Sequence, residues 1–420
     1  MGQRTGVAAQ RRGVQRSTNK LGSPWLNIDV PLVLVLITLL TFGFLMMHSA
    51  SWKVSMQISE TDSPDYLFIR QLRWLGLGLL ALVAFAWVDY HRWRHYSVVF
   101  MFAALLALIA VLVFGESYYG KVRSFYQGSY QPSELAKFVL VIYLSVWLYA
   151  KRDQLADVSF GLIPLGAIVG VIGGLIMRQP DLSAAGIVVL LGAIMFYLAG
   201  SDTRQTLILV LVALTVGYLV LRFNPTGNER VGKFLAGWQD VMNSSHHVAK
   251  AMIAFFRGGW FGVGIGRSTT KLTTLPFPHT DSVFAVVGEE TGVFGASALV
   301  ILYGLLFWRG LVIAHKAQDE LGSLLAAGLT MWITLEAFVN IASLLNLMPF
   351  AGNTLPFFSV GGSNLVSSMA AVGIVLNVSR LSEQKQQEDK RRTFGAIVDL
   401  RGRDRRRRVS SSGRTRRFEG

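Results

Sequence analysis

Long apolar segments, separated by polar connections, set the limits on how this chain can fold. Several approach the ~20 residues that an α-helix needs to cross a bilayer. Ten segments have this character, and they cover residues 30–47, 72–88, 98–114, 135–148, 162–177, 184–198, 207–221, 283–308, 324–347 and 366–378. Only 15% of the 420 residues are charged, whereas soluble proteins carry about 25%. The sequence therefore predicts an all-α integral membrane protein, a bundle of about ten transmembrane helices.

Basic residues near the ends of these segments predict the orientation of the bundle. They gather in the N-terminal tail, in the connections that contain Arg92 and Lys151, and in the C-terminal run from Arg405 to Arg408. Cytoplasmic connections are the ones enriched in Lys and Arg. With an even number of spans, both termini are then expected in the cytoplasm.

The chain divides into a membrane domain of residues 29–381 and two basic tails, 1–28 and 382–420. The C-terminal tail is charged, Ser-rich and almost free of an apolar pattern, which predicts disorder. It either sets the topology or also attracts anionic membrane lipids. Much of the net charge of +15 lies in the tails, with no zinc module or recognition helix, so no nucleic-acid partner is expected. The absence of cysteine excludes disulfides and thiolate chemistry.

A large outer loop is predicted between the seventh and eighth segments, at residues 222–280. Its basic residues are Arg222, Arg230, Lys233, Lys250, Arg257, Arg267 and Lys271. This charge indicates either an anionic ligand or plain attraction to lipid head groups. Within the loop, Val248, Met252, Ile253 and Phe256 recur at helical spacing, which predicts an amphipathic helix at the membrane interface.

Charged side chains at membrane depth are costly, so each one is a functional candidate. Gln131, Ser133, Glu134 and Lys137 open the fourth segment. Glu134 and Lys137 are three residues apart, so they share a helix face and can pair. The pair either fixes the bundle as a buried ion pair or forms the charged wall of a substrate cavity.

Two aspartates stand at the starts of later segments. Asp181 precedes the sixth segment, where it either caps the helix or faces a ligand. Asp281 ends a His-Thr-Asp sequence where the outer loop meets the eighth segment. A carboxylate there is partly desolvated yet within reach of an aqueous ligand, so it can accept a proton from a hydroxyl nucleophile, although Asp also favours the N-cap position. Glu289 and Glu290 lie two turns farther and are expected to be buried and paired.

A Gly-rich turn leads into the tenth segment. Ser359, Gly361 and Gly362 allow close backbone approach and expose N–H groups at a helix start, a geometry that favours anions. A tight turn that merely joins two helices has the same composition. The chain contains no Walker loop, Rossmann fingerprint or defensible Ser-His-Asp order. The energy for any reaction must therefore come from the substrate or from a gradient.

In this order and spacing, the motifs resemble those of the SEDS family, which includes FtsW, RodA and SpoVE. The matching stretches are QPSELAK at 131–137, QPDL at 179–182, HTD at 279–281, GEE at 288–290 and LPFFSVGGS at 355–363, with SAS at 49–51 and RQLRW at 70–74. The resemblance covers about residues 25–382. Each motif is modest alone, but their joint order is specific.

The resemblance implies a peptidoglycan glycosyltransferase that polymerises lipid II, a disaccharide-peptide on undecaprenyl pyrophosphate, with Asp281 as the catalytic residue. A sugar hydroxyl would attack an anomeric carbon whose leaving group is a lipid pyrophosphate, so no nucleotide site is needed. Cationic groups would stabilise the departing pyrophosphate. Glu289 and Glu290 are expected to support the site. The residues expected to bind substrate are Lys137, Glu134, Gln131, Ser133, Arg123, Asp181, His279, Thr280, Lys271, Ser359, Gly361 and Gly362. No metal-ligand spacing is diagnostic, which leaves assistance by Mg²⁺ or Mn²⁺ open.

The chain departs from the family pattern at several positions. The usual Glu two residues before His279 is missing, Val360 stands where the family has Tyr, and His246-His247 replaces a Tyr-Gln pair. These changes concern substrate contacts rather than the fold. They also allow a different lipid-linked substrate.

Gly288 before the two glutamates and the long tails favour an FtsW-like division protein over a RodA-like elongation polymerase. Such a protein would work on the outer face of the bacterial cytoplasmic membrane, at the division septum. Its partners would be a class B penicillin-binding transpeptidase and other division proteins.

Two other functions remain compatible with the sequence. In a lipid II flippase, Glu134, Lys137 and Asp181 would line a path for the head group. In a non-catalytic divisome scaffold, Asp281 would be dispensable. The enzyme is favoured because its acid lies outside, beside a cationic loop, and because no internal repeat typical of transporters is evident.

Overall fold

The computed structural model describes residues 28–410 except 60–62, 119–120 and 125–129, and it leaves out the side chains of residues 116–129 and 390–410. The predicted N-terminal tail therefore lies outside the described residues, apart from its last position. Within the described part, the chain forms helices joined by turns, and one two-stranded sheet.

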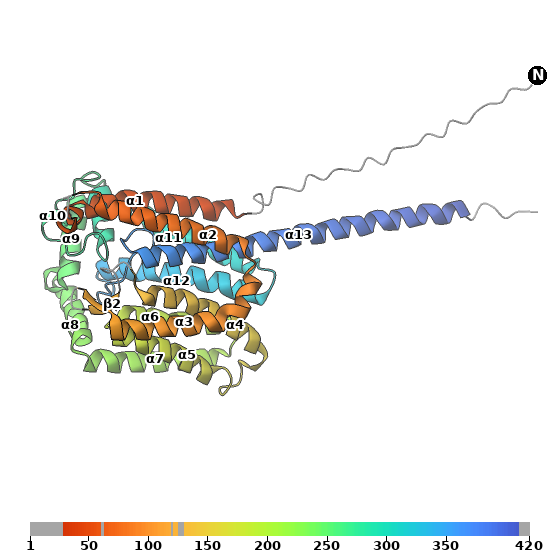
Figure 1. Ribbon diagram of the computed structural model, residues 1–420, viewed down its shortest axis with the longest axis horizontal. Helices are drawn as coiled ribbons and strands as arrows, with labels where there is room; N and C mark the ends of the chain where they lie inside the picture. The colour runs from red at the N-terminus through yellow and green to blue at the C-terminus, as the bar shows by residue number, and fades with distance from the viewer. Residues whose placement is uncertain (1–27, 60–62, 119–120, 125–129, 411–420) are drawn as a thin grey trace, which may run out of the picture.

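Each of the ten predicted segments lies mainly within a helix. The helices are α1 (Val30–Ile58), α2 (Tyr66–Trp87), α3 (Trp93–Phe114), α4 (Pro132–Lys151), α5 (Leu162–Arg178), α6 (Leu182–Leu198), α7 (Thr203–Phe223), α11 (Val283–His315), α12 (Glu320–Leu344) and α13 (Gly362–Ser410). Eight are long and apolar enough to cross a membrane, and α5 and α6 are shorter apolar helices of 17 residues. They lie along a common direction in Figure 1. The predicted helical bundle is confirmed, and the chain is a multi-pass membrane protein.

The connecting elements gather at the two ends of the bundle. The end at the left of Figure 1 carries α8 (Pro225–Gln239), α9 (His246–Gly258), α10 (Thr270–Thr273) and β2 (Lys121–Ser124), and β2 pairs antiparallel with β1 (Glu116–Tyr118). We call this the loop end, and the opposite end, from which α13 projects, the tail end. Short 3₁₀ turns complete the elements: η2 (Tyr90–Arg92), η3 (Arg152–Gln154) and η4 (Val241–Asn243).

The connection between α7 and α11 is largely helical. Its α9 contains the predicted amphipathic helix and buries Val248, Ala251 and Ala254, while Phe256 is 85% exposed. The helix α9 packs on α11, and the face of α9 at this contact is formed mostly by small residues. The predicted apolar stripe is therefore divided between the protein interior and the surface.

The helix α13 continues to Ser410, across much of the segment for which the sequence predicts a disordered tail. Residues 382–394 are rich in Gln, Glu, Lys and Arg, which are good helix formers. A helix that is already nucleated in the bundle can extend through such residues at little cost, because each added residue gains one hydrogen bond.

The most enclosed spans are α12 and α13. In their apolar windows 78% and 89% of the residues are buried, against none in α7. Polar side chains on such helices have no access to water and must pair inside the bundle. Glu336, Asn340 and Asn364 on these helices are each at most 4% exposed.

The helix α11 is broken at Gly292, where φ is 68° and ψ is −167°. The Glu289 and Glu290 carbonyls accept hydrogen bonds from the amides of residues 263 and 264, and the amides of residues 293 and 294 donate to the carbonyls of residues 259 and 260. The Gly-rich segment after α9 therefore satisfies the backbone groups that the break exposes. A Cβ at Gly292 would lie 2.5 Å from the Gly262 nitrogen, so only glycine fits.

Replacing Gly292 by Ala is expected to destabilise the protein by at least about 1–3 kcal/mol, the cost of a strained backbone at positive φ. The matched control is Gly304→Ala in the same helix, where a Cβ meets nothing within 4 Å. That change should be neutral or stabilising by up to about 1 kcal/mol. The midpoint of thermal unfolding in detergent, followed by tryptophan fluorescence, measures both. Equal midpoints for the two variants would contradict the role of the break.

Candidate active site

The His-Thr-Asp segment before α11 lies against the segment before α13. The Ser359 hydroxyl donates to the Thr280 carbonyl (2.7 Å), and the Val360 amide donates to the His279 carbonyl (2.8 Å). Asp281 follows directly and is half-buried. Two motifs that are distant in the sequence are therefore joined by two hydrogen bonds. These bonds fix the backbone of the residues that lead into Asp281.

Gln131, which precedes α4, connects to the segments that precede α13 and α6. Its backbone amide donates to the Ser363 hydroxyl (3.1 Å), and its side-chain Nε2 donates to Ser133 Oγ (2.9 Å) and Asp181 Oδ2 (3.3 Å). Asp181 also caps α6, because its Oδ1 accepts from the Ala184 amide (3.1 Å). The capping interpretation of Asp181 is confirmed, and the same carboxylate reaches the motif that opens α4.

Asp281 is held from the side of α12. The N-cap of α11 falls on Ser282, so Asp281 does not occupy the capping position that its residue type also favours. Asn340 Nδ2 donates to the Asp281 carbonyl (3.0 Å) and to the Asn353 carbonyl (2.6 Å). Asp281 Oδ2 lies 3.6 Å from the point where a Cβ would stand on Gly352. The carboxylate therefore faces the segment between α12 and α13.

The side chain of His279 is neutral at neutral pH. Burial, followed by the positive charge of Arg70, lowers the pKa of His279 to about 4. Its Nδ1 is buried and has no hydrogen-bond partner among the described residues. A neutral imidazole donates from one nitrogen and accepts at the other, so His279 can serve a ligand but does not supply a cation there.

Lys137 lies between two carboxylates inside the bundle. Its Nζ donates to Glu134 Oε1 (2.9 Å) and to Glu336, and its side chain is 2% exposed. Asn364 Nδ2 donates to the other oxygens of Glu134 (2.7 Å) and Glu336 (3.2 Å), and Trp332 Nε1 donates to Glu336 (2.8 Å). Of the two interpretations of the Glu134–Lys137 pair, the structure shows the buried ion pair. We call these five residues the central ion cluster.

The sequence motifs include neither Glu336 nor Asn340, although both lie at the centre of the site. A signal was present, since Glu336 is the one charged residue of the ninth predicted segment, 324–347. An acid inside an apolar span is a functional candidate by itself. Asn340 is four residues farther on and shares the same helix face.

Lys271 belongs to a second buried ion cluster, which we call the α10 cluster. It pairs with Glu290 and also donates to Ser49 Oγ (2.6 Å). Glu289 accepts from the Thr270 hydroxyl (2.9 Å) and the Thr270 amide (3.3 Å). These contacts tie α10 to α1 and α11. Lys271 is 5% exposed, so the predicted substrate contact by this residue is not visible in the structure.

The predicted Gly-rich turn packs on α2. The Gly361 amide donates to Gln71 Oε1 (3.3 Å), and a Cβ on Gly362 would lie 2.2 Å from the Trp74 ring. Close packing therefore requires glycine at the start of α13. Anion binding at this turn stays a prediction. Arg123 belongs to β2, and its side chain lies outside the described ones.

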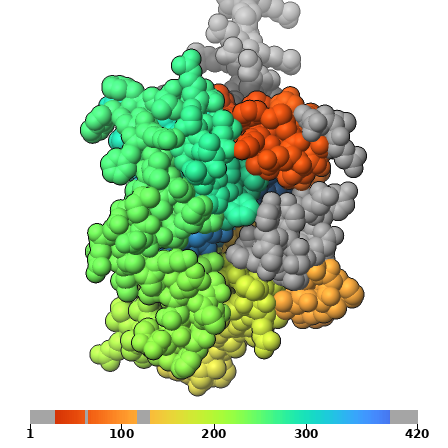
Figure 2. Space-filling model, turned by 90° about the vertical axis from the view of Figure 1, so that its left-hand side faces the viewer, coloured from red at the N-terminus to blue at the C-terminus, as the bar shows by residue number. Residues whose placement is uncertain are grey.

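The loop end is hollowed at its centre. Figure 2 faces this end and shows blue atoms from the C-terminal part of the chain at the floor of a hollow, bordered by the green atoms of the α8–α9 region. In the described part of the chain, no three His, Asp or Glu side chains gather closely enough to hold a metal ion. The loop end is therefore recessed, and the described side chains form no metal cage.

Comparison with known proteins explains the convergence of these motifs. Residues 30–384 match the model of the FTSW_RODA_SPOVE family, described as cell cycle protein. The chain belongs to this family. The resemblance to SEDS proteins is therefore confirmed, and it extends over the whole membrane domain.

Individual family members align over most of their length. Stage V sporulation protein E of Bacillus subtilis is 34% identical over 373 residues, which cover 87% of this chain and 99% of that protein. A protein named probable peptidoglycan glycosyltransferase FtsW, from Legionella pneumophila, is 35% identical and covers 81% of this chain and 88% of its own length.

Solved structures show the same fold. A chain from a structure described as "Structural coordination of polymerization and crosslinking by a peptidoglycan synthase complex" matches with a TM-score of 0.69 and 30% identity, over 86% of this chain and all of that one. The rod shape determining protein RodA of Thermus thermophilus matches with a TM-score of 0.62 and 27% identity, over 85% of this chain and 98% of RodA.

Replacing Lys137 by Met is expected to lower the free energy of unfolding by about 3–5 kcal/mol, because it leaves two buried carboxylates without a cation. The control is Lys233→Met, which breaks the exposed Lys233–Glu229 pair on α8 and should cost no more than about 1 kcal/mol. Adding Glu336→Gln to Lys137→Met should recover part of the loss. Thermal midpoints in detergent measure all three, and equal losses for the two lysine variants would contradict the cluster's role.

His279 is expected to make the protein less stable as the pH falls from about 6.5 towards 4. Above this window the imidazole is neutral in both states, while within it the unfolded chain binds a proton that the folded chain does not. The loss is at most about 1.4 kcal/mol per pH unit. In His279→Gln the midpoint of thermal unfolding should change less with pH over this window. His246→Gln, at an exposed position of α9, should leave the change of the midpoint with pH as it is in the native protein. An unchanged slope in His279→Gln would refute the assignment.

Proposed function

We propose that this chain is a peptidoglycan glycosyltransferase that polymerises lipid II at the loop end, with Asp281 as the general base. The observation that carries the proposal is the place of Asp281: it is half-buried and adjoins the segment where the family motifs meet. Membership of the family supports the activity, since relatives at 31–35% identity are named as probable peptidoglycan glycosyltransferases. A half-buried acid at the hollowed loop end suits a reaction between two lipid-linked sugars.

The reaction joins a sugar hydroxyl to an anomeric carbon. The hydroxyl oxygen forms the new bond to carbon, its proton passes to Asp281, and the bond from carbon to the phosphate oxygen breaks. The electron pair of that bond leaves with the lipid pyrophosphate. Asp281 accelerates the step because it removes the proton as the nucleophile attacks. Asn340 holds the backbone of Asp281 in place, and the carboxylate faces the segment around Gly352.

The two buried ion clusters bear on which cations can stabilise the departing pyrophosphate. Lys137 and Lys271 are both neutralised by carboxylates, so in this proposal they hold the walls of the site rather than the pyrophosphate. Arg70 lies beside the His-Thr-Asp segment, and Arg230 Nη1 reaches the Ala351 carbonyl (3.5 Å). Both are half-exposed. We assign the stabilisation of the negative charge that develops on the pyrophosphate to these two guanidinium groups, because a guanidinium binds phosphates through several donors at once.

The central ion cluster argues against a flippase. A transport path would have to pass Glu134 and Lys137, which are 7% and 2% exposed as side chains and are tied to Glu336 and Asn364. Opening such a path would separate buried charges, which is costly. A scaffold without chemistry gives no reason for a half-buried acid at the hollowed loop end.

The proposal includes a division role in the bacterial cytoplasmic membrane, with the loop end outside and both termini in the cytoplasm. Support for an FtsW-like rather than a RodA-like protein comes from several relatives at 31–35% identity that are named as probable FtsW proteins. The matched structure, which is described as a peptidoglycan synthase complex that polymerises and crosslinks, supports a crosslinking partner. We propose that this partner is a class B penicillin-binding transpeptidase at the septum.

Purified protein with its transpeptidase partner is expected to convert lipid II into glycan strands, and Asp281→Asn should slow this by about 10²- to 10⁴-fold, the range for loss of a general base. The control is Asp240→Asn, an exposed aspartate of the same outer connection that caps η4, and it should polymerise at the native rate. Gel analysis of glycan length measures the product.

Each result decides between functions. Equal polymer from Asp281→Asn and native protein would remove Asp281 from the base role. No polymer from the native protein with its partner, alongside lipid II movement across vesicles, would support the flippase. Rescue of division by Asp281→Asn in cells would support the scaffold.

A further inference from the structure

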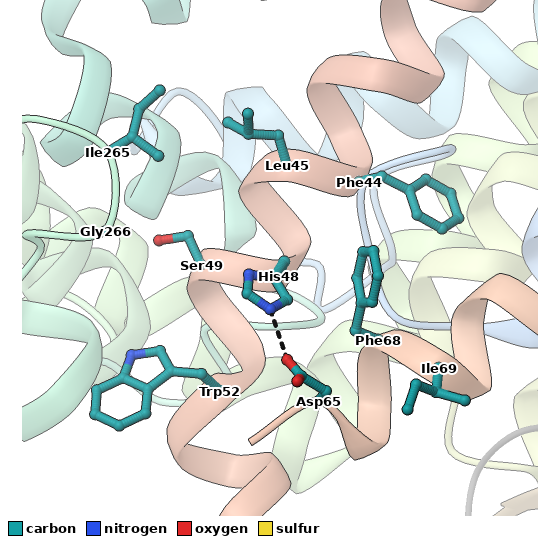
Figure 3. A pocket seen from close by; sticks show the side chains of 10 residues that line it. All are labelled: Phe44, Leu45, His48, Ser49, Trp52, Asp65, Phe68, Ile69, Ile265 and Gly266. Carbon is teal, nitrogen blue, oxygen red and sulfur yellow. Dashed lines mark hydrogen bonds and ion pairs between the residues drawn. The ribbon is translucent and has the colours of Figure 1, made fainter. Parts of the chain in front are cut away.

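A cleft between α1 and α2 lies at the loop end, apart from Asp281. It has a volume of about 850 Å³ and is lined by Phe44, Leu45, His48, Ser49, Trp52, Asp65, Phe68, Ile69, Ile265 and Gly266. Figure 3 shows His48 between two groups of side chains, with Phe44, Phe68 and Ile69 on one side and Leu45, Ser49 and Ile265 on the other. Of its lining residues only Ser49 belongs to a family motif, and the proposed chemistry uses none of them.

The depth of the cleft follows from the length of α1. The helix has 29 residues, so it is about 43 Å long, whereas the hydrocarbon core of a bilayer is about 30 Å thick. It begins beside the ion pair of Asp29 with Arg309, which marks a polar boundary at the tail end. About twenty residues of α1 then cross the hydrocarbon, and Ser49 is the twentieth. The cleft therefore lies where hydrocarbon gives way to lipid head groups.

The chemistry of the walls changes at the same depth. Leu45 and Ile69 are 44% and 46% exposed, and they and the phenyl rings form an apolar lower part. Above them His48 Nε2 and Asp65 Oδ1 pair at 2.9 Å, with side chains 48% and 52% exposed. Trp52 adds an indole, which favours the membrane interface. The cleft thus has an apolar part in the hydrocarbon and a charged part among the head groups.

The charged part combines a carboxylate, an imidazole and the start of a helix. Asp65 directly precedes α2, and the first turn of that helix borders the cleft. A helix N-terminus favours a phosphate group. His48 keeps its Nε2 on Asp65, and a ring that carries protons on both nitrogens can also donate from Nδ1 to that phosphate. The Asp65 carboxylate favours an ammonium group, which can donate to it. A head group that carries both charges complements this arrangement better than one with phosphate alone.

We propose that the cleft binds a membrane glycerophospholipid whose head group carries a primary amine, as in phosphatidylethanolamine. The ammonium lies against Asp65, the phosphate lies by His48 and the start of α2, and an acyl chain lies along Phe44, Leu45 and Ile69. The proposal does not depend on the glycosyltransferase activity, since it rests on the cleft alone.

The bound lipid also touches the α10 cluster. Ser49, at the cleft, donates to Glu290 (2.7 Å) and accepts from Lys271 (2.6 Å). Lys53 reaches over to the Leu272 carbonyl on α10. A lipid packed on this part of α1 therefore supports the segment that leads from α10 to Asp281, and its binding should raise the thermal midpoint.

The test compares lipids with matched acyl chains on delipidated, full-length protein in detergent. Native mass spectrometry of lipid adducts should show phosphatidylethanolamine bound at least about tenfold more tightly than phosphatidylcholine, whose quaternary amine cannot donate to Asp65. Asp65→Asn should remove that preference. Leu45→Trp and Ile69→Trp fill the cleft and should abolish tight binding, whereas Ile37→Trp, at an exposed position on the same helix, should bind as the native protein does.

Several outcomes overturn the proposal. Equal affinity for the two lipids, a preference for phosphatidylglycerol, or native binding in the cleft-filled variants would each do so. Displacement of the phospholipid by a polyprenyl phosphate at lower concentration would assign the cleft to the substrate lipid instead. Should a tryptophan variant fail to fold, the comparison of lipids on native protein and Asp65→Asn decides alone.

Discussion

The neutralisation of Lys137 is the interaction on which the loop end depends. An ammonium group inside a helical bundle is stable only with anions beside it and hydrogen bonds to those anions. Glu134 supplies one anion from the same helix, and Glu336 supplies the other from α12. Asn364 binds both carboxylates from α13. Three helices therefore have one relative arrangement that leaves no buried charge unpaired, and the polar segments at their ends take their positions from it.

The same requirement governs the backbone. A break in a spanning helix exposes carbonyl and amide groups that lipid cannot satisfy. At Gly292 the segment after α9 supplies both donors and acceptors, so α9, the Gly-rich segment and α11 form one unit. The glutamates just before the break hold α10 through the α10 cluster. This unit carries the chain to Asp281, and it connects the acid to the lipid-facing cleft through Ser49.

Much of this organisation was predictable, for a physical reason. The length of an apolar segment is a local property, so the spans could be assigned residue by residue. The cost of burying charge made Asp281 and the Glu134–Lys137 pair visible as candidates. The buried face of α9 was harder to predict, because periodicity identifies an apolar stripe on a helix but not the element against which the helix packs. Phe256 belongs to that stripe and is nevertheless 85% exposed, since α11 accepts the small residues of α9 instead.

The sequence by itself determined the membrane class, the helical segments, the family and the acid proposed as the base. Only the tertiary structure decided that Lys137 and Lys271 are neutralised by carboxylates, that Asp181 caps α6, and that Asn340 holds Asp281. It also decided that α1 and α2 part to leave a cleft. This difference between sequence and structure has one cause. Hydrophobicity and helix signals act between neighbours in the chain, whereas charge pairing and packing depend on which distant helices come together.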